Sequence, residues 1–111
     1  MNSRDFLWFC GLFEGEGCFY VQKSKGGKDN RISYRYPKMQ INMTDRDVLE
    51  RVAEITSIST IYKRKPRPRR KQQYSWYVNR TADVLALMKQ MLPHMGERRS
   101  AKIEELLQEF E

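Results

Sequence analysis

The feature that most constrains the fold is a change of hydrophobic period that occurs twice in the same order. Residues 18–24 and 32–43 alternate apolar and polar side chains, as half-buried strands do. Residues 44–55 then place apolar side chains at helical spacing. The same succession returns in the aromatic strands at 59–65 and 73–80 and in the helical stretch that follows them. Paired strands separated by helices predict an α+β fold.

A further helix is expected at each end of this pattern. The first begins with Ser3 as N-cap and Asp5 in its first turn, and it ends at the glycines before the first strand. Thr44 and Thr81 are expected to cap the following helices, and residues 97–110 form the last. The resulting order, αββαββα, predicts a four-stranded antiparallel sheet with helices on one face.

Length and composition limit the remaining possibilities. At 111 residues the chain is expected to be a single domain, 1–111. Cys10 and Cys18 lack the spacing of a zinc motif and are too few for a disulfide framework, which favours a reducing compartment. The apolar run at 6–13 is too short to span a membrane. We therefore expect a soluble, intracellular protein with no membrane partner.

Charge is distributed unevenly along the chain. The net charge is +7, and 14 of the 21 Lys and Arg lie in segments 17–43 and 58–80, together with one of the 14 acids, Asp29. These segments contain the predicted strands, while the other acids fall mostly in the predicted helices. Segregated positive charge favours a polyanionic partner.

One face of the predicted sheet is polar and basic. Residues 25–30 supply a turn after the first strand, and Pro37 in the second indicates an edge or a bulge. The alternate positions that point away from the apolar side are Tyr20, Gln22, Ser24, Lys38, Gln40 and Asn42. This face either binds a ligand or is simply solvated. Trp8 and Trp76 have the spacing of core residues.

The end of the first helix carries the most specific motif. Residues 9–17, FCGLFEGEG, resemble the signature of the LAGLIDADG homing endonuclease family, and the element order extends the resemblance over nearly the whole chain. Gly11 and Gly15 lie four residues apart on one helical face, where they permit close approach of a second helix. An ordinary helix cap is the alternative explanation for Gly15 and Gly17.

The resemblance implies a homodimer, because the chain has one copy of the motif. The motif helices would pack together, and the sheets would form a saddle over palindromic or pseudo-palindromic double-stranded DNA. The implied interface residues are Leu7, Trp8, Gly11, Leu12 and Gly15.

The resemblance also implies the chemistry, which is site-specific, metal-dependent cleavage of both DNA strands. Glu16 is the implied catalytic acid and, with Gly15, the metal ligand; Glu14 is expected to be structural. The cofactor would be Mg²⁺, with Mn²⁺ as an alternative and Ca²⁺ as a non-cleaving substitute. Thr44 or Asp45, of which we favour Asp45, occupies the position of a polar residue near the attacking water.

A basic catalytic residue is expected at the start of the last helix. The direct alignment falls on Glu97, and we select Arg98 beside it, although both Arg98 and Arg99 are also explained by solvation at a helix start. Asp45 is equally explained as a charge at a helix N-terminus.

The implied DNA-binding residues lie on the strands and on the basic hairpin tip. They are Tyr20, Gln22, Ser24, Lys25, Lys28, Arg31, Arg35, Lys38, Gln40, Asn42, Tyr62, Arg64, Arg67, Arg69, Arg70, Lys71, Gln73, Ser75 and Tyr77. Basic side chains in such a tip contact phosphate more often than they read bases.

Two other functions remain open on the same scaffold: a DNA-binding protein without cleavage, suggested by the acid at Glu97, and an RNA-splicing maturase. Other nuclease chemistries fit poorly, since the one histidine, His94, cannot form an HNH or His-Cys site.

Overall fold

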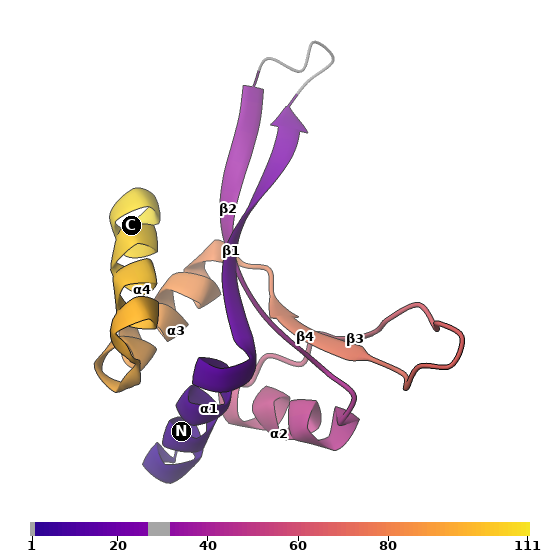
Figure 1. Cartoon of the computed structure of the whole chain (residues 1–111). Coiled ribbons are helices and arrows are strands. Elements are labelled where there is room, and N and C mark those ends of the chain that lie inside the picture. Colours follow the sequence, from indigo (N-terminus) through magenta and orange to yellow (C-terminus); the bar gives the residue numbers. More distant parts are fainter. Residues whose placement is uncertain (1, 27–31) are drawn as a thin grey trace.

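The structure, a computed structural model, describes residues 2–26 and 32–111. Its helices and strands follow the predicted order (Figure 1). In sequence they are α1 (Ser3–Glu16), β1 (Gly17–Gly26), β2 (Ile32–Met43), α2 (Arg46–Thr56), β3 (Ile61–Lys63), β4 (Tyr74–Val78), α3 (Thr81–Met91), the short 3₁₀ helix η1 (Leu92–His94) and α4 (Glu97–Phe110). Most of the turn predicted at 25–30 lies outside the described residues.

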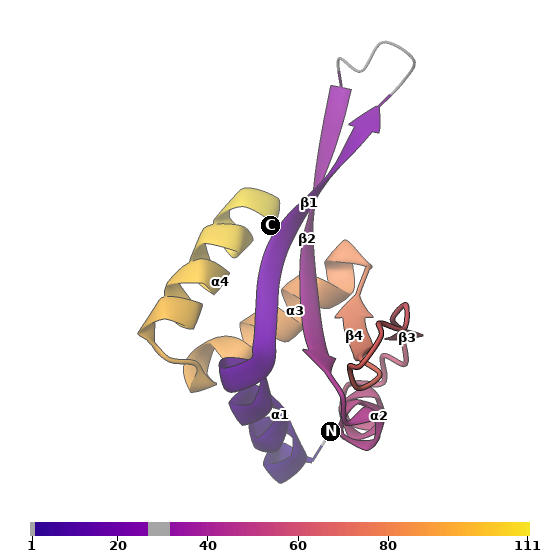
Figure 2. The same ribbon diagram turned by 45° about the vertical axis from the view of Figure 1, so that its right-hand side comes forward.

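The four strands form one antiparallel sheet in the order β1-β2-β4-β3. β1 and β2 pair without interruption from Gly17↔Ile41 to Gly26↔Ile32, and this ribbon extends past the helices (Figure 2). β4 pairs with β2 only from Met39 to Met43. Pro37 therefore lies where β2 has a neighbouring strand on one side alone, which confirms the predicted edge position without a bulge.

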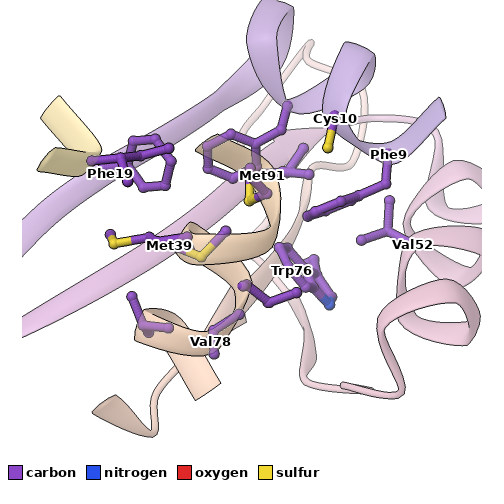
Figure 3. Packing of buried hydrophobic residues seen from close by; sticks show 14 of the residues in the cluster. Phe9, Cys10, Phe19, Met39, Val52, Trp76, Val78 and Met91 are labelled. Atoms are coloured by element: carbon purple, nitrogen blue, oxygen red, sulfur yellow. The ribbon is translucent and has the colours of Figure 1, made fainter. Parts of the chain in front are cut away.

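The core lies between one face of the sheet and the helices. Met39 and Ile41 of β2, Trp76 of β4, and Phe9 and Phe13 of α1 are fully buried in one cluster. Figure 3 shows Phe9, Met39 and Trp76 within this cluster. The rings of Phe9 and Trp76 meet edge to face with centroids 5.7 Å apart. Trp76 also donates a hydrogen bond of 2.8 Å from Nε1 to the Ile58 carbonyl, so its polar atom is satisfied inside the core.

The predicted helix caps are each wrong by one residue. Asn2, rather than Ser3, caps α1 by accepting a hydrogen bond of 2.8 Å from the Arg4 amide. Asp45, rather than Thr44, precedes α2, and Arg80, rather than Thr81, precedes α3; neither makes a side-chain cap bond. The helical pattern predicts which turns are helical more accurately than it predicts the first residue of the helix, because neighbouring polar residues have similar cap preferences.

Candidate nucleic-acid interface and acidic centre

The sheet face opposite the core is polar, as the alternation predicts. A shallow hollow on it is lined by side chains from β1, β2, β4 and the end of β3. The lining residues are Tyr20, Gln22, Gln40, Tyr62, Arg64, Lys65, Ser75, Tyr77 and Asn79. We call these residues, with Asn42, the open face. Seven of the lining residues are among the predicted DNA-binding residues.

Sequence reasoning missed Lys65 and Asn79 on this face. Asn79 has the same strand parity as Ser75 and Tyr77, so extending the alternation one step past β4 would have found it. Lys65 follows β3 in the loop and carries no periodic signal. Tyr20 is half-buried, and burial raises the pKa of its phenol, so the hydroxyl stays protonated as a hydrogen-bond donor at neutral pH. Ser24 lies further out along β1, opposite Tyr34.

A second hollow adjoins the open face at the loop between β3 and β4. Its lining is strongly cationic and includes Arg64, Lys65, Arg67, Arg70 and Lys71. Asn42, Pro66, Gln72 and Gln73 complete it. The loop is anchored by Gln72, which sequence reasoning missed, through bonds from Nε2 to the carbonyls of Arg64 (2.6 Å) and Gln73 (3.0 Å). Arg69 is exposed at the loop tip with φ of 61°.

Two predicted DNA-binding cations are engaged elsewhere. Arg35 has the strand parity of Met39 and Ile41 and points toward α4, where Nε and Nη2 contact Glu109 at 2.8 and 3.1 Å. Lys38 faces the other way but is 8% exposed, and its Nζ donates to the Asn79 carbonyl at 2.8 Å. Burial lowers the pKa of Lys38. In the structure Arg35 therefore links β2 to α4, and Lys38 lies beneath the surface; DNA contact by either residue stays a prediction.

Three further predicted DNA-binding residues cannot be placed. Lys28 and Arg31 lie outside the described residues, and the same holds for the side chain of Lys25.

The outer face of α1 is exposed and has glycine in place of a side chain at two positions. Leu7 is 49% exposed, Gly11 and Gly15 are exposed, and Trp8 and Leu12 are half-buried at the margins. A Cβ added at Gly11 or Gly15 would meet no atom of the described chain within 4 Å. Packing within this chain therefore does not require either glycine. Gly17 differs, because a Cβ there would overlap the ring of Phe13.

The two acids of the motif have different surroundings. Glu14 accepts a hydrogen bond from the Gly96 amide through Oε1, and its Oε2 lies 3.2 Å from Arg99 Nε. It thereby joins the end of α1 to the start of α4. Glu16 is exposed at the last position of α1 and has no ion pair or hydrogen bond with any described side chain. A carboxylate at a helix C-terminus is electrostatically unfavourable, so a cation at Glu16 would be stabilised.

The basic residues at the start of α4 lie close to this acidic end. Arg98 and Arg99 line a groove with Gly17, which directly follows Glu16. Arg98 is exposed, whereas Arg99 is partly covered, with its guanidinium 5.5 Å from the centre of the Phe13 ring. Glu97 is exposed in the first turn of α4 and is not part of the groove lining.

Asp45 belongs to the same end of the sheet. It is exposed two residues after β2 ends, and Ile41 of β2 pairs with Gly17. The described residues contain no group of three or more His, Cys, Asp or Glu side chains that could hold a metal ion. The Glu16 carboxylate has the oxygen donors that Mg²⁺ prefers, and further ligands would have to come from outside this part of the chain.

A cationic polar sheet face next to an exposed acid defines a protein suited to binding and processing a polyanion. A sequence model of the LAGLIDADG endonuclease family matches residues 9–105. The chain therefore belongs to this family. None of the curated proteins compared with it gives a significant match.

Solved structures of homing endonucleases share the fold. I-CvuI, solved in complex with a DNA target in the presence of Mg with the DNA not cleaved, has a TM-score of 0.77 at 18% identity, covering 96% of this chain and 68% of that one. The archaeal intron-encoded I-Vdi141I, complexed with DNA, has a TM-score of 0.72 at 18% identity with the same coverages. I-CeuI, also complexed with DNA, has a TM-score of 0.69 at 15% identity and covers 96% of this chain and 55% of that one.

No helix within residues 2–26 and 32–111 is long and apolar enough to cross a membrane.

Proposed function

We propose that this chain is a homodimeric, site-specific DNA endonuclease that cleaves both strands with Mg²⁺. The observation that carries the proposal is the outer face of α1, where Gly11 and Gly15 leave open space beside exposed Leu7 and the helix ends at the unengaged Glu16. Glycine weakens a helix by about 1 kcal/mol relative to alanine. A helix that carries two glycines without internal need is suited to close packing against another helix.

A second copy would supply that helix. Two α1 helices meeting at Gly11 and Gly15 bury Leu7, with Trp8 and Leu12 at the margins, in an isologous contact. Both Glu16 side chains then lie at the same end of the helix pair. At this end of the helix pair each chain contributes one carboxylate, Glu16, that has no partner among the described residues, so the dimer contributes two.

The open face is proposed to bind the DNA. Arg64, Lys65 and the loop cations Arg67, Arg70 and Lys71 neutralise phosphates, which accounts for most of the affinity. Gln22, Gln40 and Asn42 on the strands have the amide groups that read base edges in the major groove.

At the proposed cleavage site, Glu16 and the backbone carbonyl of Gly15 would hold a Mg²⁺ ion, which when bound would supply Lewis-acid stabilisation of the phosphate and a more acidic water. Asp45 orients the attacking water and accepts its proton as the new P–O bond forms. The P–O bond to the leaving oxygen then breaks, and that oxygen takes a proton from solvent. Arg98, exposed in the groove beside Gly17, stabilises the negative charge that develops on the scissile phosphate.

The test is Glu16→Gln assayed for cleavage in Mg²⁺ and for binding in Ca²⁺. Removing the charged ligand is expected to lower cleavage by at least about 100-fold, on the order of losing one electrostatic transition-state interaction, while DNA binding changes less than about threefold. Glu104→Gln removes an exposed acid from α4 and is the matched control. An equal loss of binding and cleavage in Glu16→Gln would contradict a metal-holding role.

A binding protein without cleavage is the second candidate. It is favoured by exposed Glu97 beside Arg98, which reduces the positive potential where the scissile phosphate would lie. The two candidates separate in one assay, because only the endonuclease linearises a plasmid containing the selected target in Mg²⁺.

A further inference from the structure

A hydrogen-bonded network on the open face converges on one atom. The side-chain oxygen of Asn42 accepts from Ser75 Oγ at 2.5 Å, from Gln40 Nε2 at 2.7 Å and from Arg64 Nη1 at 3.5 Å. Arg64 Nη1 also donates to Ser75 Oγ at 3.3 Å. Ser75 lies opposite Asn42 in the β2–β4 pairing and is 2% exposed, while Asn42 is exposed. The network therefore rests on a buried hydroxyl and presents an exposed amide.

The direction of donation in this network is set by Arg64. A guanidinium has donors and no acceptor, so Ser75 Oγ must accept from Arg64 and uses its single hydrogen toward Asn42. The atom of Asn42 that faces both groups must then be its carbonyl oxygen. A rotated amide would place its NH₂ group against the guanidinium and leave the Ser75 hydroxyl without an acceptor.

The fixed orientation determines what Asn42 presents to solvent. Its oxygen is occupied by donors from the protein, and Nδ2 makes no hydrogen bond with any other described residue. Recognition of adenine by asparagine requires both groups, because the oxygen accepts from N6 while the nitrogen donates to N7. Asn42 has only the donor half available.

We propose that Asn42 is a donor-only base reader held in place by Ser75 and Arg64, and that it disfavours cytosine at the position it faces. This inference rests on the proposed DNA-binding function of the open face. In the major groove guanine presents O6 and N7, thymine presents O4 and adenine presents N7 as acceptors, whereas cytosine presents only its N4 amino donor. Ser75 contacts no DNA in this account and is a positioning residue.

The register places the selected base near the middle of the target. Ile41, the neighbour of Asn42, pairs with Gly17, which directly follows Glu16. Gln22 lies further along the ribbon, opposite Tyr36. The base read by Asn42 is therefore expected nearer to the point of cleavage than the base read by Gln22, once in each half-site of a homodimer's target.

The test is selection of bound duplexes from a randomised DNA library in Ca²⁺, which measures base preference without cleavage. The position assigned to Asn42 is the one whose base frequencies change in Asn42→Ala. There the unmodified protein is expected to enrich guanine, thymine and adenine about tenfold over cytosine, which corresponds to ~1.4 kcal/mol. Asn42→Asp replaces the free donor by an acceptor and should reverse the preference toward cytosine.

Ser75→Ala tests the positioning role separately. Without the hydroxyl the Asn42 amide is free to rotate and present its oxygen, so cytosine should rise to within about threefold of the other bases. Gln22→Ala, on the same face but outside the network, is the control and should leave this position unchanged. Asn42→Asp changes an exposed residue, so the test stands even if Ser75→Ala fails to fold.

The outcomes distinguish this inference from the proposed function. Cytosine preferred at this position in the unmodified protein, or a preference against cytosine that persists in Asn42→Asp, would overturn the donor-only assignment. A preference unaltered in folded Ser75→Ala would overturn the role of Ser75. Failure to enrich any duplex would instead count against DNA binding by the open face as a whole.

Discussion

At the scale of single residues, Glu14 and Glu16 differ in function although they stand two positions apart in one motif. Glu14 makes the contacts that attach α4, and Glu16 makes none within the described chain. Because Glu14 lies beside Arg99, the positive charge at the start of α4 is held next to the acidic end of α1. The motif thus combines a structural acid and an acid available to a cation.

Glu14→Ala is expected to destabilise the fold by about 1–2 kcal/mol, since hydrogen bonds to charged groups contribute on this scale. The substitution leaves the Arg99 guanidinium without its carboxylate partner over the Phe13 ring. Chemical denaturation would measure the destabilisation, with Glu104→Ala on the exposed side of α4 as the control. A change below about 0.3 kcal/mol in Glu14→Ala would show that the Glu14 interactions are not stabilising.

Sequence reasoning succeeded at residues whose environment is set by local periodicity. The alternation along β1 and β2 placed Tyr20, Gln22, Gln40 and Asn42 on one face without knowledge of any partner. It also gives Arg35 the parity of Met39 and Ile41, but the partner of Arg35, Glu109 of α4, lies 74 positions away and carries no periodic signal. The bond from the Gly96 amide to Glu14 spans 82 positions, so the structural character of Glu14 could be expected but its partner could not.

At the scale of elements, the glycines within α1 and the glycine that directly follows it have different structural roles. Gly17 is required by contact with Phe13 inside the chain, whereas Gly11 and Gly15 face open space. The two kinds of glycine should respond oppositely to the same substitution, which separates packing within the chain from packing between chains.

Gly11→Ala is expected to stabilise an isolated chain by up to about 1 kcal/mol, because alanine favours the helix and its methyl group meets nothing. The same methyl group should weaken the proposed dimer by holding the helices apart. Denaturation of monomers at low concentration and sedimentation equilibrium measure the two effects. Dimer affinity that is unchanged or stronger would contradict the interface.

Gly17→Ala is the opposite case, with an expected destabilisation of about 1–3 kcal/mol from overpacking against Phe13. Thermal unfolding of a preparation kept monomeric would measure this effect. Stability equal to that of Gly11→Ala would contradict the distinction between the two glycines.

The ribbon of β1 and β2 is linked to α4 by Arg35 and Glu109. The hydrogen bond from Arg35 to Glu109, with the charge of Arg35, lowers the pKa of the Glu109 carboxyl. When the pKa of a carboxyl is lower in the folded state, its charged form stabilises the fold at pH values above the pKa of the unfolded state, ~4.3 for glutamate. This stabilisation is lost as the pH falls through the pKa of the folded state.

The difference in unfolding free energy between the unmodified protein and Glu109→Gln should therefore be present at neutral pH and vanish in acid. Denaturant titrations across that range measure it, with Glu104→Gln as the control for an acid that has no ion pair among the described residues. A difference that persists below the folded pKa of Glu109 would show that the pair acts through packing rather than charge.

At the scale of the whole molecule, positive charge is concentrated in the strand segments and the β3–β4 loop. The basic segments form the open face and the β3–β4 loop, while α4 carries a run of acids. Periodicity predicted this separation because it assigned the basic segments to strands. It could not predict which cations remain free for a partner, since Lys38 is buried by contacts across the sheet.

Binding of the selected DNA should fall steeply with salt, because the loop cations displace counterions from phosphates. Replacing Arg67 and Arg70 by Gln is expected to reduce the slope of log affinity against log salt by roughly 0.9 for each phosphate that is no longer neutralised. Lys89→Gln on α3 removes a cation that pairs with Glu111 and should leave the slope unchanged. Equal slopes for all three proteins would exclude the loop from the DNA interface.

The central claim, that two α1 helices meet so that their terminal acids converge, is tested most directly by a distance between the two chains. Cys18 is exposed two residues after Glu16, while Cys10 is buried and burial raises the pKa of its thiol to about 11, so a spin label attaches at Cys18. In dipolar resonance measurements we expect strong coupling between the two labels in the unmodified protein and none in Gly11→Leu. Absence of coupling in the unmodified protein, or coupling unchanged in Gly11→Leu, would contradict the account.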